Sequence, residues 1–291
     1  MGYTRGRSQG LAPDMKYTVT ASLSVLDALT KVAPDSSKTS LRSWIREGRV
    51  AVDGEVAVDG SAQVNPSQTV VIGPKARVIE CHIRILYEDA HIVVVDKPPK
   101  LLSVATKTET ARTVHNFLKK HFPELYVVHR LDKDTSGLML FALSAQAREA
   151  LDALFEKHAI KRCYTGVVEG QLEESTGTWE SYLYEDDQYR VHSSPLPGRG
   201  VLATTHYDLV TGTKKFSLVT FTLETGKKNQ IRVHCQEASH PIVGDKKYGA
   251  VTDPIKRVCL HAHALTLLHP VTQKPLHFTS PVPKEFRMLT R

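Results

Sequence analysis

The chain has 291 residues, of which 41% are apolar and 24% are charged, as is typical of a globular protein. These fractions exclude a collagen-like, coiled-coil or intrinsically disordered chain, and the length favours about two domains. Lysine and arginine number 38 against 31 acidic residues, and the resulting net charge of +7 favours a polyanionic partner, nucleic acid first.

The ends of the chain and its cysteines predict a cytoplasmic protein in its reduced form. The N-terminal residues MGYTRGRSQG lack the apolar run of a signal peptide, and no segment approaches the ~18 continuous apolar residues that span a bilayer. The four cysteines lie far apart and form no CxxC pair, which indicates neither a disulfide framework nor a zinc site. His261 and His263 share one face of a predicted strand without nearby cysteine or carboxylate, which favours a structural or RNA-contact role.

The N-terminal part predicts a small domain over residues 15–74, after a flexible tail rich in Gly, Arg and Ser over residues 1–14. Apolar spacing predicts two helices followed by three strands, at Leu23–Val32, Ser40–Glu47, Val50–Val52, Glu55–Val58 and Thr69–Ile72. The dipeptide Asp53-Gly54 is typical of the turn of a β-hairpin. The pattern stops at Gly73-Pro74-Lys75, where we place a domain boundary.

The remainder, residues 80–291, alternates strands and helices. Apolar or alternating runs predict strands at Ile92–Val95, Leu138–Leu143, Tyr164–Val168, Thr204–Leu209 and Ser217–Leu223. Ser144 is placed to cap a helix that carries Ala147 and Leu151 on one face. This mixture predicts an α+β domain with a large, partly antiparallel sheet.

The densest group of chemically active side chains is VHRLDKDTSG at residues 128–137, directly before the predicted strand at Leu138. Ionisable and hydrogen-bonding residues on a loop that enters a rigid strand are typical of a functional site. The alternative is a solvated turn in which aspartate and arginine neutralise each other, and the residue types alone favour that alternative.

Two further segments carry functional residue types. TGKKNQIRVH at residues 225–234 runs into a predicted helix whose cationic start suits a phosphate or a carboxylate. HPIVGDKKYG at residues 240–249 has the composition of a structured binding loop. Tyr164, at the start of a strand, is either an ordinary core tyrosine or an aromatic ring on which a base stacks.

HRLDKDTSGL resembles the signature of the RluA family of pseudouridine synthases, in which an HRLD motif carries a nucleophilic aspartate. ILYEDAHIVVVDKPP is similar to the first motif of that family, TGKKNQIRVH with HPIVGDKKYG to its Gln-Ile-Arg motif and following loop, and LHAHALTLLHP to its last strand. These motifs occur in the family's order. The resemblance implies a pseudouridine synthase fold over residues 80–291, with a large mixed, mostly antiparallel sheet flanked by helices.

The resemblance also implies the chemistry: isomerisation of specific uridines in RNA to pseudouridine, without cofactor or metal. Asp132 corresponds to the nucleophile and Arg232 to the arginine that pairs with it. Tyr164 corresponds to the aromatic residue that stacks on the target base and helps to remove the C5 proton. Arg130 corresponds to the residue that fills the space left by the flipped base. The expected substrate-binding residues are His129, Arg130, Leu131, Lys227, Asn229, Gln230 and Ile231.

Residues 15–74 resemble an S4-type RNA-binding domain, which many members of this family carry. The resemblance implies a basic helical face that grips phosphates, made of Lys38, Arg42, Arg46 and Arg49. The alternative is a solvated helix surface, which is the usual meaning of such charges. With an S4-like domain, large-subunit ribosomal RNA is the expected partner, with transfer RNA as the alternative, and we expect a monomer.

Two other functions remain open at this point. The chain is either an enzyme or a catalytically idle RNA-binding factor for ribosome assembly on the same scaffold; the complete set of Asp132, Tyr164 and Arg232 favours the enzyme. Alternatively, water captures the intermediate, and the protein is a uracil-nucleoside glycosylase. The products discriminate between a synthase and a glycosylase, because pseudouridine formation leaves every nucleotide with its base whereas hydrolysis leaves an abasic site.

Overall fold

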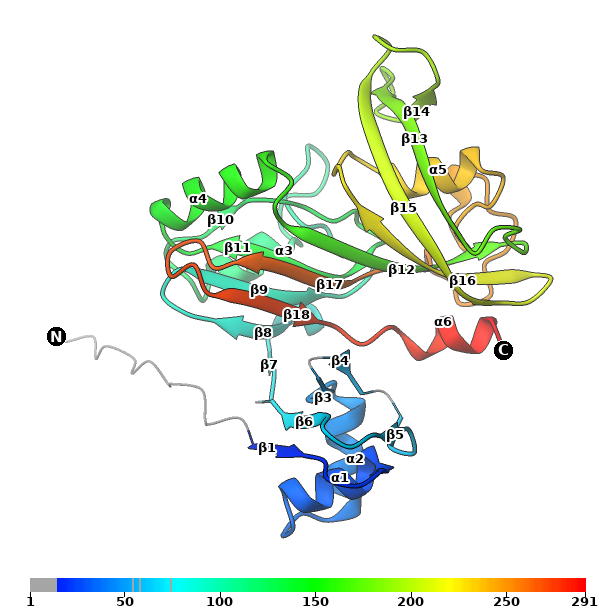
Figure 1. The fold of residues 1–291 in the computed structure, drawn as a ribbon. Helices are drawn as coiled ribbons and strands as arrows, with labels where there is room; N and C mark the ends of the chain where they lie inside the picture. Colours follow the sequence, from blue (N-terminus) through cyan, green and yellow to red (C-terminus); the bar gives the residue numbers. More distant parts are fainter. Residues whose placement is uncertain (1–14, 54, 58, 74) are drawn as a thin grey trace, which may run out of the picture. The chain divides into compact units, whose positions relative to one another are not determined.

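The computed structural model describes residues 15–53, 55–57, 59–73 and 75–291 (Figure 1). These residues form two compact units. The N-terminal unit extends to Arg77 and includes Thr279–Pro281, and the C-terminal unit comprises Val78–Phe278 and Val282–Arg291. The predicted tail over residues 1–14 lies outside the described residues, as do Gly54 of the predicted turn and Pro74 of the predicted boundary.

The N-terminal unit packs two helices against short strands. Its elements are β1 (Met15–Thr18), β2 (Leu23–Ser24), α1 (Val25–Val32), α2 (Lys38–Arg46), β3 (Val50–Val52), β4 (Glu55–Val56), β5 (Gln63–Val64) and β6 (Thr69–Ile72). The strands pair in the order β1-β6-β3-β4, with β2 beside β5. Leu29 of α1 and Leu41 of α2 are fully buried in one core with Val50 and Val70 of the sheet.

Serine caps move the starts of both predicted helices. Ser24 Oγ accepts a hydrogen bond from the Asp27 N–H at 3.1 Å, so α1 begins at Val25, two residues later than predicted. Ser37 Oγ accepts from the Ser40 N–H at 3.1 Å, so α2 begins at Lys38, two residues earlier than predicted. The predicted hairpin is confirmed, because β3 and β4 pair antiparallel.

One long sheet forms the frame of the C-terminal unit. Its strand order is β14-β13-β15-β16-β12-β17-β11-β9-β8-β7, with β10 beside β11 and β18 beside β17. The strands are β7 (Arg77–Val78), β8 (Arg84–Glu88), β9 (Ile92–Lys97), β10 (Tyr126–Val127), β11 (Ser136–Ala142), β12 (Lys161–Glu169), β13 (Thr176–Glu185), β14 (Val191–Ser194), β15 (Val201–Gly212), β16 (Phe216–Leu223), β17 (Leu260–Leu268) and β18 (Pro275–Thr279). β11 and β17 are parallel, whereas β9–β11, β12–β16 and β13–β15 are antiparallel. The predicted α+β class with a large mixed, mostly antiparallel sheet is therefore confirmed.

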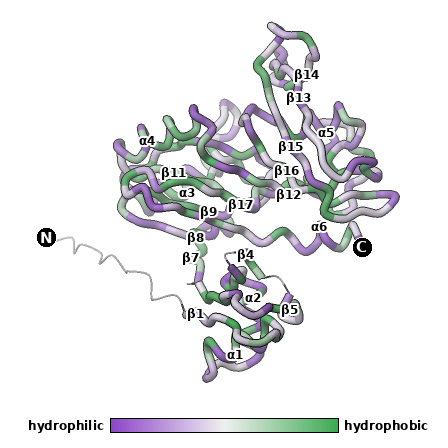
Figure 2. Tube along the Cα trace, viewed as in Figure 1, coloured by the Kyte–Doolittle hydropathy of each residue, from purple (hydrophilic) through white to green (hydrophobic). Residues whose placement is uncertain are grey.

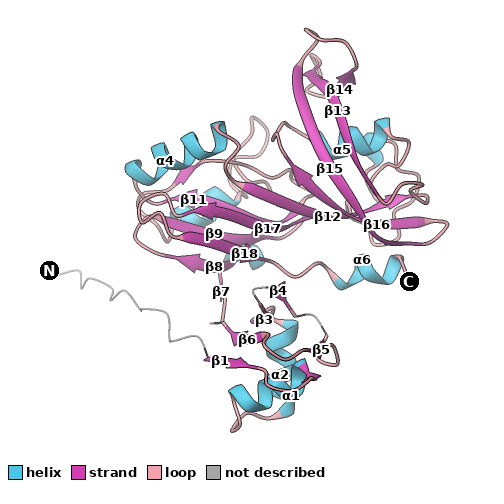
Figure 3. Ribbon diagram, in the orientation of Figure 1, coloured by secondary structure: helices cyan, strands magenta, loops and turns pink. Residues whose placement is uncertain are grey.

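Helices pack beside this sheet (Figure 3). They are α3 (Val114–Lys119), α4 (Ala145–Glu156), α5 (Gln230–Glu237) and α6 (Lys284–Leu289), with 3-10 turns at Glu80–His82 and Lys246–Tyr248. α4 contacts β10 and β11, and α5 contacts β13, β14 and β15. The predicted cap is confirmed, since Ser144 Oγ accepts from the Ala147 N–H at 3.2 Å.

β11 is buried along its whole length, and this burial makes it a rigid support for the loop that precedes it. Its neighbours β9 and β17 are also strongly apolar (Figure 2). Leu140 faces one apolar cluster, with Ala147 and Leu151 of α4, whereas Met139 and Phe141 face another. Within the described ranges, no helix is long and apolar enough to cross a membrane.

Candidate active site

The loop before β11 carries Asp132 and is fastened on both sides of that residue. The Leu131 N–H donates to Ser103 Oγ at 3.1 Å, and Ser103 Oγ donates to the Leu131 carbonyl at 2.6 Å. On the other side, Lys97 Nζ donates to the Lys133 carbonyl at 3.0 Å. The backbone around Asp132 is therefore held in place, while its side chain remains 19% exposed.

Lys97 is fully buried at the end of β9, and its burial lowers the pKa of the ammonium to about 7. Its Nζ also donates to the carbonyls of Pro98 at 3.0 Å and Leu101 at 2.8 Å. Together with the Lys133 carbonyl, these acceptors match the three N–H bonds of an ammonium group. The negative charges of Asp134 and Asp132 also favour the charged form.

Arg232, on α5, lies between two carboxylates. Its Nε and Nη2 donate to Oδ2 and Oδ1 of Asp245 at 2.6 and 2.8 Å, and its Nη1 donates to Asp132 Oδ2 at 3.1 Å. The Asp245 side chain is 1% exposed, so this two-point contact fixes the plane of the guanidinium. Burial opposes the charge, but hydrogen bonds and Coulombic attraction to Asp245 and Asp132 outweigh it and raise the pKa of Arg232. Arg232 is therefore a permanent cation oriented toward Asp132.

Asn229 and Tyr248 enclose the same guanidinium. The Arg232 Cζ lies 4.9 Å from the centroid of the Tyr248 ring. Asn229 Nδ2 donates to the Tyr248 hydroxyl at 2.8 Å, and Asn229 Oδ1 accepts from Arg232 Nη1 at 3.3 Å. Asn229 has a φ of 54°, a left-handed conformation that asparagine tolerates better than most residues.

Gln230 lines the site, but its amide is bonded within the protein. Its Oε1 accepts from Thr225 Oγ1 at 2.8 Å and from the Lys227 N–H at 2.9 Å. Its Nε2 donates to the Thr204 carbonyl at 3.0 Å and to Thr205 Oγ1 at 2.9 Å. Gln230 therefore fixes the loop that presents the exposed side chain of Lys227.

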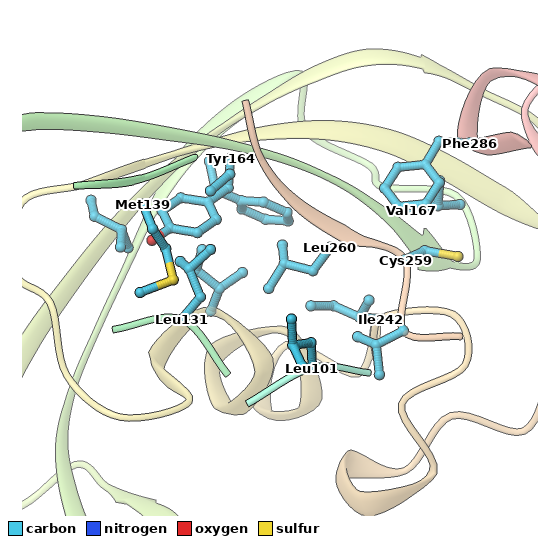
Figure 4. Close-up of a cluster of buried hydrophobic side chains, with 14 of the residues drawn as sticks. Leu101, Leu131, Met139, Tyr164, Val167, Ile242, Cys259, Leu260 and Phe286 are labelled. Atoms are coloured by element: carbon cyan, nitrogen blue, oxygen red, sulfur yellow. The ribbon is translucent and has the colours of Figure 1, made fainter. Parts of the chain in front are cut away.

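Tyr164, on β12, forms the apolar side of the site. The residue is 8% exposed, and its ring packs in the core with Leu131 and Met139 (Figure 4). Burial raises the pKa of the hydroxyl to about 12, so the phenol stays protonated at neutral pH. An aromatic ring beside a carboxylate offers a surface on which a base can stack.

One pocket brings together the residues that the sequence predicts for catalysis and substrate binding, with His129 as the exception. It is lined by Asp132, Tyr164 and Arg232, and by Arg130, Leu131, Lys227, Asn229, Gln230 and Ile231. These residues come from the loop before β11, from β12 and from the start of α5. The 4% exposure of Ile231 makes it part of the apolar wall.

His129 makes a structural contact instead. Its Nε2 accepts a hydrogen bond from the Leu140 N–H at 2.8 Å, and its ring centroid lies 5.1 Å from that of Phe155. Burial lowers the pKa of His129 to about 3, so the ring is neutral. The residue lines a second pocket, which adjoins the first.

Three of the four residues predicted for the basic face of the N-terminal unit lie on α2, and the fourth does not. Lys38, Arg42 and Arg46 are exposed and follow one another at intervals of four residues along α2. The expectation that Arg49 shares this face is wrong, because the helix ends at Arg46. Arg49 Nε instead donates to the Gly73 carbonyl at 3.1 Å, and its Cζ lies 4.9 Å from the centre of the Trp44 ring.

The two histidines of β17 both make hydrogen bonds inside the sheet. His261 Nδ1 lies 2.8 Å from Ser136 Oγ, and His263 Nδ1 lies 3.0 Å from Thr165 Oγ1. Within the part of the chain that the structure describes, no group of three or more His, Cys, Asp or Glu side chains is placed to hold a metal ion.

Sequence reasoning missed three residues of the site. Asp245 and Tyr248 lie in the 240–249 segment, which the sequence marked only as a binding loop, and Lys97 appeared only within the motif ILYEDAHIVVVDKPP. The sequence does not show which charged side chains become buried. The one signal for these three residues was their position in or next to a family motif.

This pocket joins a carboxylate, a fixed guanidinium and an aromatic ring on the mixed sheet, and it is the candidate active site. Residues 91–237 match the family model described as RNA pseudouridylate synthase. The chain therefore belongs to the RluA-type family of RNA pseudouridine synthases, and the predicted family and enzyme class are confirmed.

Individual relatives agree with this assignment. The chain is 34% identical over 215 residues to "Uncharacterized RNA pseudouridine synthase YhcT" of Bacillus subtilis, with 71% of each chain covered. It is 32% identical over 285 residues to "Ribosomal large subunit pseudouridine synthase D" of Neisseria meningitidis, covering 89% of this chain and 76% of the relative. In fold it is similar to "Human RNA Pseudouridylate Synthase Domain Containing 1", with a TM-score of 0.59 and 24% identity over 70% of this chain and 85% of the other.

Proposed function

We propose that this synthase converts uridines of large-subunit ribosomal RNA to pseudouridine, with Asp132 as the nucleophile. The observation that carries the proposal is the 3.1 Å hydrogen bond from Arg232 Nη1 to Asp132 Oδ2 in a pocket that Tyr164 also lines. Several relatives that cover about nine-tenths of the chain carry the name ribosomal large subunit pseudouridine synthase D, which supports this RNA as the substrate.

In the proposed reaction, the Asp132 carboxylate attacks the target uridine, either at the ribose C1′ or at the uracil ring. The glycosidic bond between C1′ and N1 breaks and the uracil rotates. A new bond then forms between C1′ and C5, and the bond between Asp132 and the substrate breaks, which regenerates the free carboxylate. C5 loses its hydrogen and N1 gains a proton, so atoms balance without a cofactor. Arg232 stabilises the negative charge of the carboxylate and fixes its direction.

The target base must leave the RNA stack to reach this pocket, at a cost of a few kcal/mol. Tyr164 offers the ring on which the flipped uracil stacks. Arg130 is exposed at the same pocket, where its long side chain suits the space that the base leaves in the RNA. Lys227 is also exposed there and supplies positive charge for the RNA backbone.

We further propose that residues 15–74 act as an S4-like RNA-binding domain and residues 80–291 as the catalytic domain. The exposed cations Lys38, Arg42 and Arg46 on one face of α2 support this division. Replacing all three by glutamine should weaken RNA binding and make the salt dependence less steep, by about 0.7–0.9 in slope for each phosphate that the protein no longer neutralises. The rate at saturating RNA should not change. Wild-type affinity with a wild-type salt slope would contradict the proposal.

The proposed reaction is tested with ribosomal RNA that carries tritium at C5 of uridine. Wild type should release tritium, because forming the C1′–C5 bond expels the C5 hydrogen, and Asp132→Asn should release none while still binding RNA. Asp152→Asn is the matched control, because Asp152 is an exposed partner of Arg148 on α4. Turnover by Asp132→Asn would refute the nucleophile.

The same assay, together with analysis of the RNA product, separates the alternatives. Tight RNA binding by wild type without tritium release would favour an idle RNA-binding factor or another RNA, and labelled transfer RNA then decides between them. Abasic sites in place of pseudouridine would indicate a glycosylase.

A further inference from the structure

A second pocket adjoins the Asp132 pocket, and its unshared residues have no part in the reaction proposed above. The two pockets share Arg130, Tyr164, Leu223 and Lys227. Arg162 of β12 and Glu156 at the end of α4 line the second pocket alone. Three cations therefore face a single carboxylate, and this excess of positive charge favours an anionic ligand.

Arg162 is the feature that distinguishes this pocket from an ordinary basic surface. Its Nε is buried and, among the described residues, has no hydrogen-bond partner; nor does any described carboxylate form an ion pair with its guanidinium. Burial lowers the pKa of Arg162 below its usual value. A buried donor without an acceptor is costly in a folded protein, so such a group is a candidate for ligand contact.

The surroundings of Arg162 hold the guanidinium without neutralising it. Its Cζ lies 5.7 Å from the centre of the Phe155 ring. A Cβ added to Gly226 would lie 2.1 Å from Arg162 Nη1, so the guanidinium packs directly against the backbone of this glycine and would have to shift for a larger residue. A ring and a bare backbone position the cation but supply no counter-charge.

We propose that this second pocket binds a phosphodiester group of the RNA, next to the uridine that occupies the Asp132 pocket, with the half-buried Arg162 as its anchor. The inference rests on the proposed function, because the RNA must enter through the shared wall. Tyr164 lines both pockets, so a base stacked on its ring lies at the wall shared with the pocket that Arg162 lines. The planar guanidinium matches two phosphate oxygens at once, and Arg130 and Lys227 add charge at the rim.

The test measures binding of pentauridylate, and of the same oligomer with neutral methylphosphonate linkages, by wild type and three variants. Arg162→Gln should bind the charged oligomer about tenfold more weakly, with a salt slope less steep by about 0.7. Arg162→Lys should keep the slope because it keeps the charge. Arg148→Gln, which removes an exposed arginine on α4, is the matched control and should behave as wild type.

Three results would overturn the proposal: unchanged affinity and slope in Arg162→Gln, an equal loss of affinity for the charged and the neutral oligomer, or a wild type that does not prefer the charged oligomer. Melting temperatures of both Arg162 variants show whether the fold survives, and the retained slope of Arg162→Lys keeps the test valid if Arg162→Gln unfolds. If wild type releases tritium and Arg162→Gln binds RNA as wild type does, only the phosphate site is refuted. If binding depends on charge through Arg162 but no tritium is released, only the proposed synthase reaction is refuted.

Discussion

Replacing Asp245 by asparagine should destabilise the protein, because Asp245 is the buried counter-charge of Arg232. Its side chain is 1% exposed and accepts hydrogen bonds of 2.6 and 2.8 Å from that guanidinium. Removing one partner of a buried ion pair costs about 3–5 kcal/mol. The amide oxygen of asparagine keeps one hydrogen bond to a charged donor, worth about 1.5–3 kcal/mol. We therefore expect the free energy of unfolding to fall by about 2 kcal/mol.

The same substitution should lower turnover, because among the described residues Asp132 is then the one carboxylate that still pairs with the guanidinium. Without Asp245, the guanidinium can move together with the Asp132 side chain, so it no longer fixes the direction of the nucleophile. A displacement of about 1 Å at the reacting atoms lowers the rate about 100-fold. We expect kcat for tritium release to fall by that factor, with KM within about threefold of wild type.

Urea unfolding and tritium release measure the two effects on Asp245→Asn. The control is Asp152→Asn, which removes the same charge from an exposed pair with Arg148 and should cost less than about 1 kcal/mol. If Asp245→Asn matched this control in both stability and kcat, the argument that Asp245 positions Arg232 would fail.

Three further predictions concern Lys97, Gly137 and Tyr164. Because burial lowers the pKa of Lys97 from 10.5 to about 7, the unfolded chain binds more protons than the folded protein between pH 7 and 10.5. The free energy of unfolding therefore rises with pH in that range by up to about 1.4 kcal/mol per pH unit. Lys97→Met should remove this rise in urea unfolding, and an equal rise in wild type and variant would contradict the prediction. Gly137 has a φ of 113°, and an added Cβ would lie 2.2 Å from the Ala262 carbonyl oxygen. Gly137→Ala should therefore lower the free energy of unfolding by more than about 3 kcal/mol. Thermal unfolding measures this loss, and a wild-type Tm would refute the prediction. Tyr164→Phe should keep RNA affinity, because the ring stays, and should slow tritium release at least about 100-fold, because it removes the hydroxyl expected to help remove the C5 hydrogen; a wild-type rate would limit Tyr164 to stacking.

Local signals in the sequence placed two short strands better than the ends of the long strands and of the helices. β12 begins three residues before its predicted start, and β15 extends three residues beyond the prediction at each end. β3 and β6 have the predicted bounds, because short apolar or alternating runs bounded by turn residues describe a strand directly. The helix starts were shifted by two residues, since several serines lie near each start and only the folded chain shows which of them accepts the capping hydrogen bond. Arg49 was misplaced for a related reason: its position relative to the helix depends on where α2 ends.

The site could be predicted only as far as family motifs extend. The Asp132–Arg232 pair joins residues 100 positions apart, and the resemblance alone linked them. Lys97 reaches across 36 positions to the Lys133 carbonyl, and Asp245 reaches Arg232 from the following loop. No periodicity encodes such contacts, because they depend on which strands become neighbours in the sheet.

The contrast between Asp132 and Asp245 explains why only one of them suits the role of nucleophile. Arg232 donates to both oxygens of Asp245, which is almost fully buried, so its lone pairs are directed at the guanidinium. Among the described residues, Asp132 accepts from Arg232 through Oδ2 alone and is 19% exposed, so Oδ1 is open to a ligand in the pocket. A nucleophile must be oriented without being saturated. Asp132→Asn should therefore abolish turnover, whereas Asp245→Asn should only reduce it; the reverse order in the tritium assay would exchange their roles.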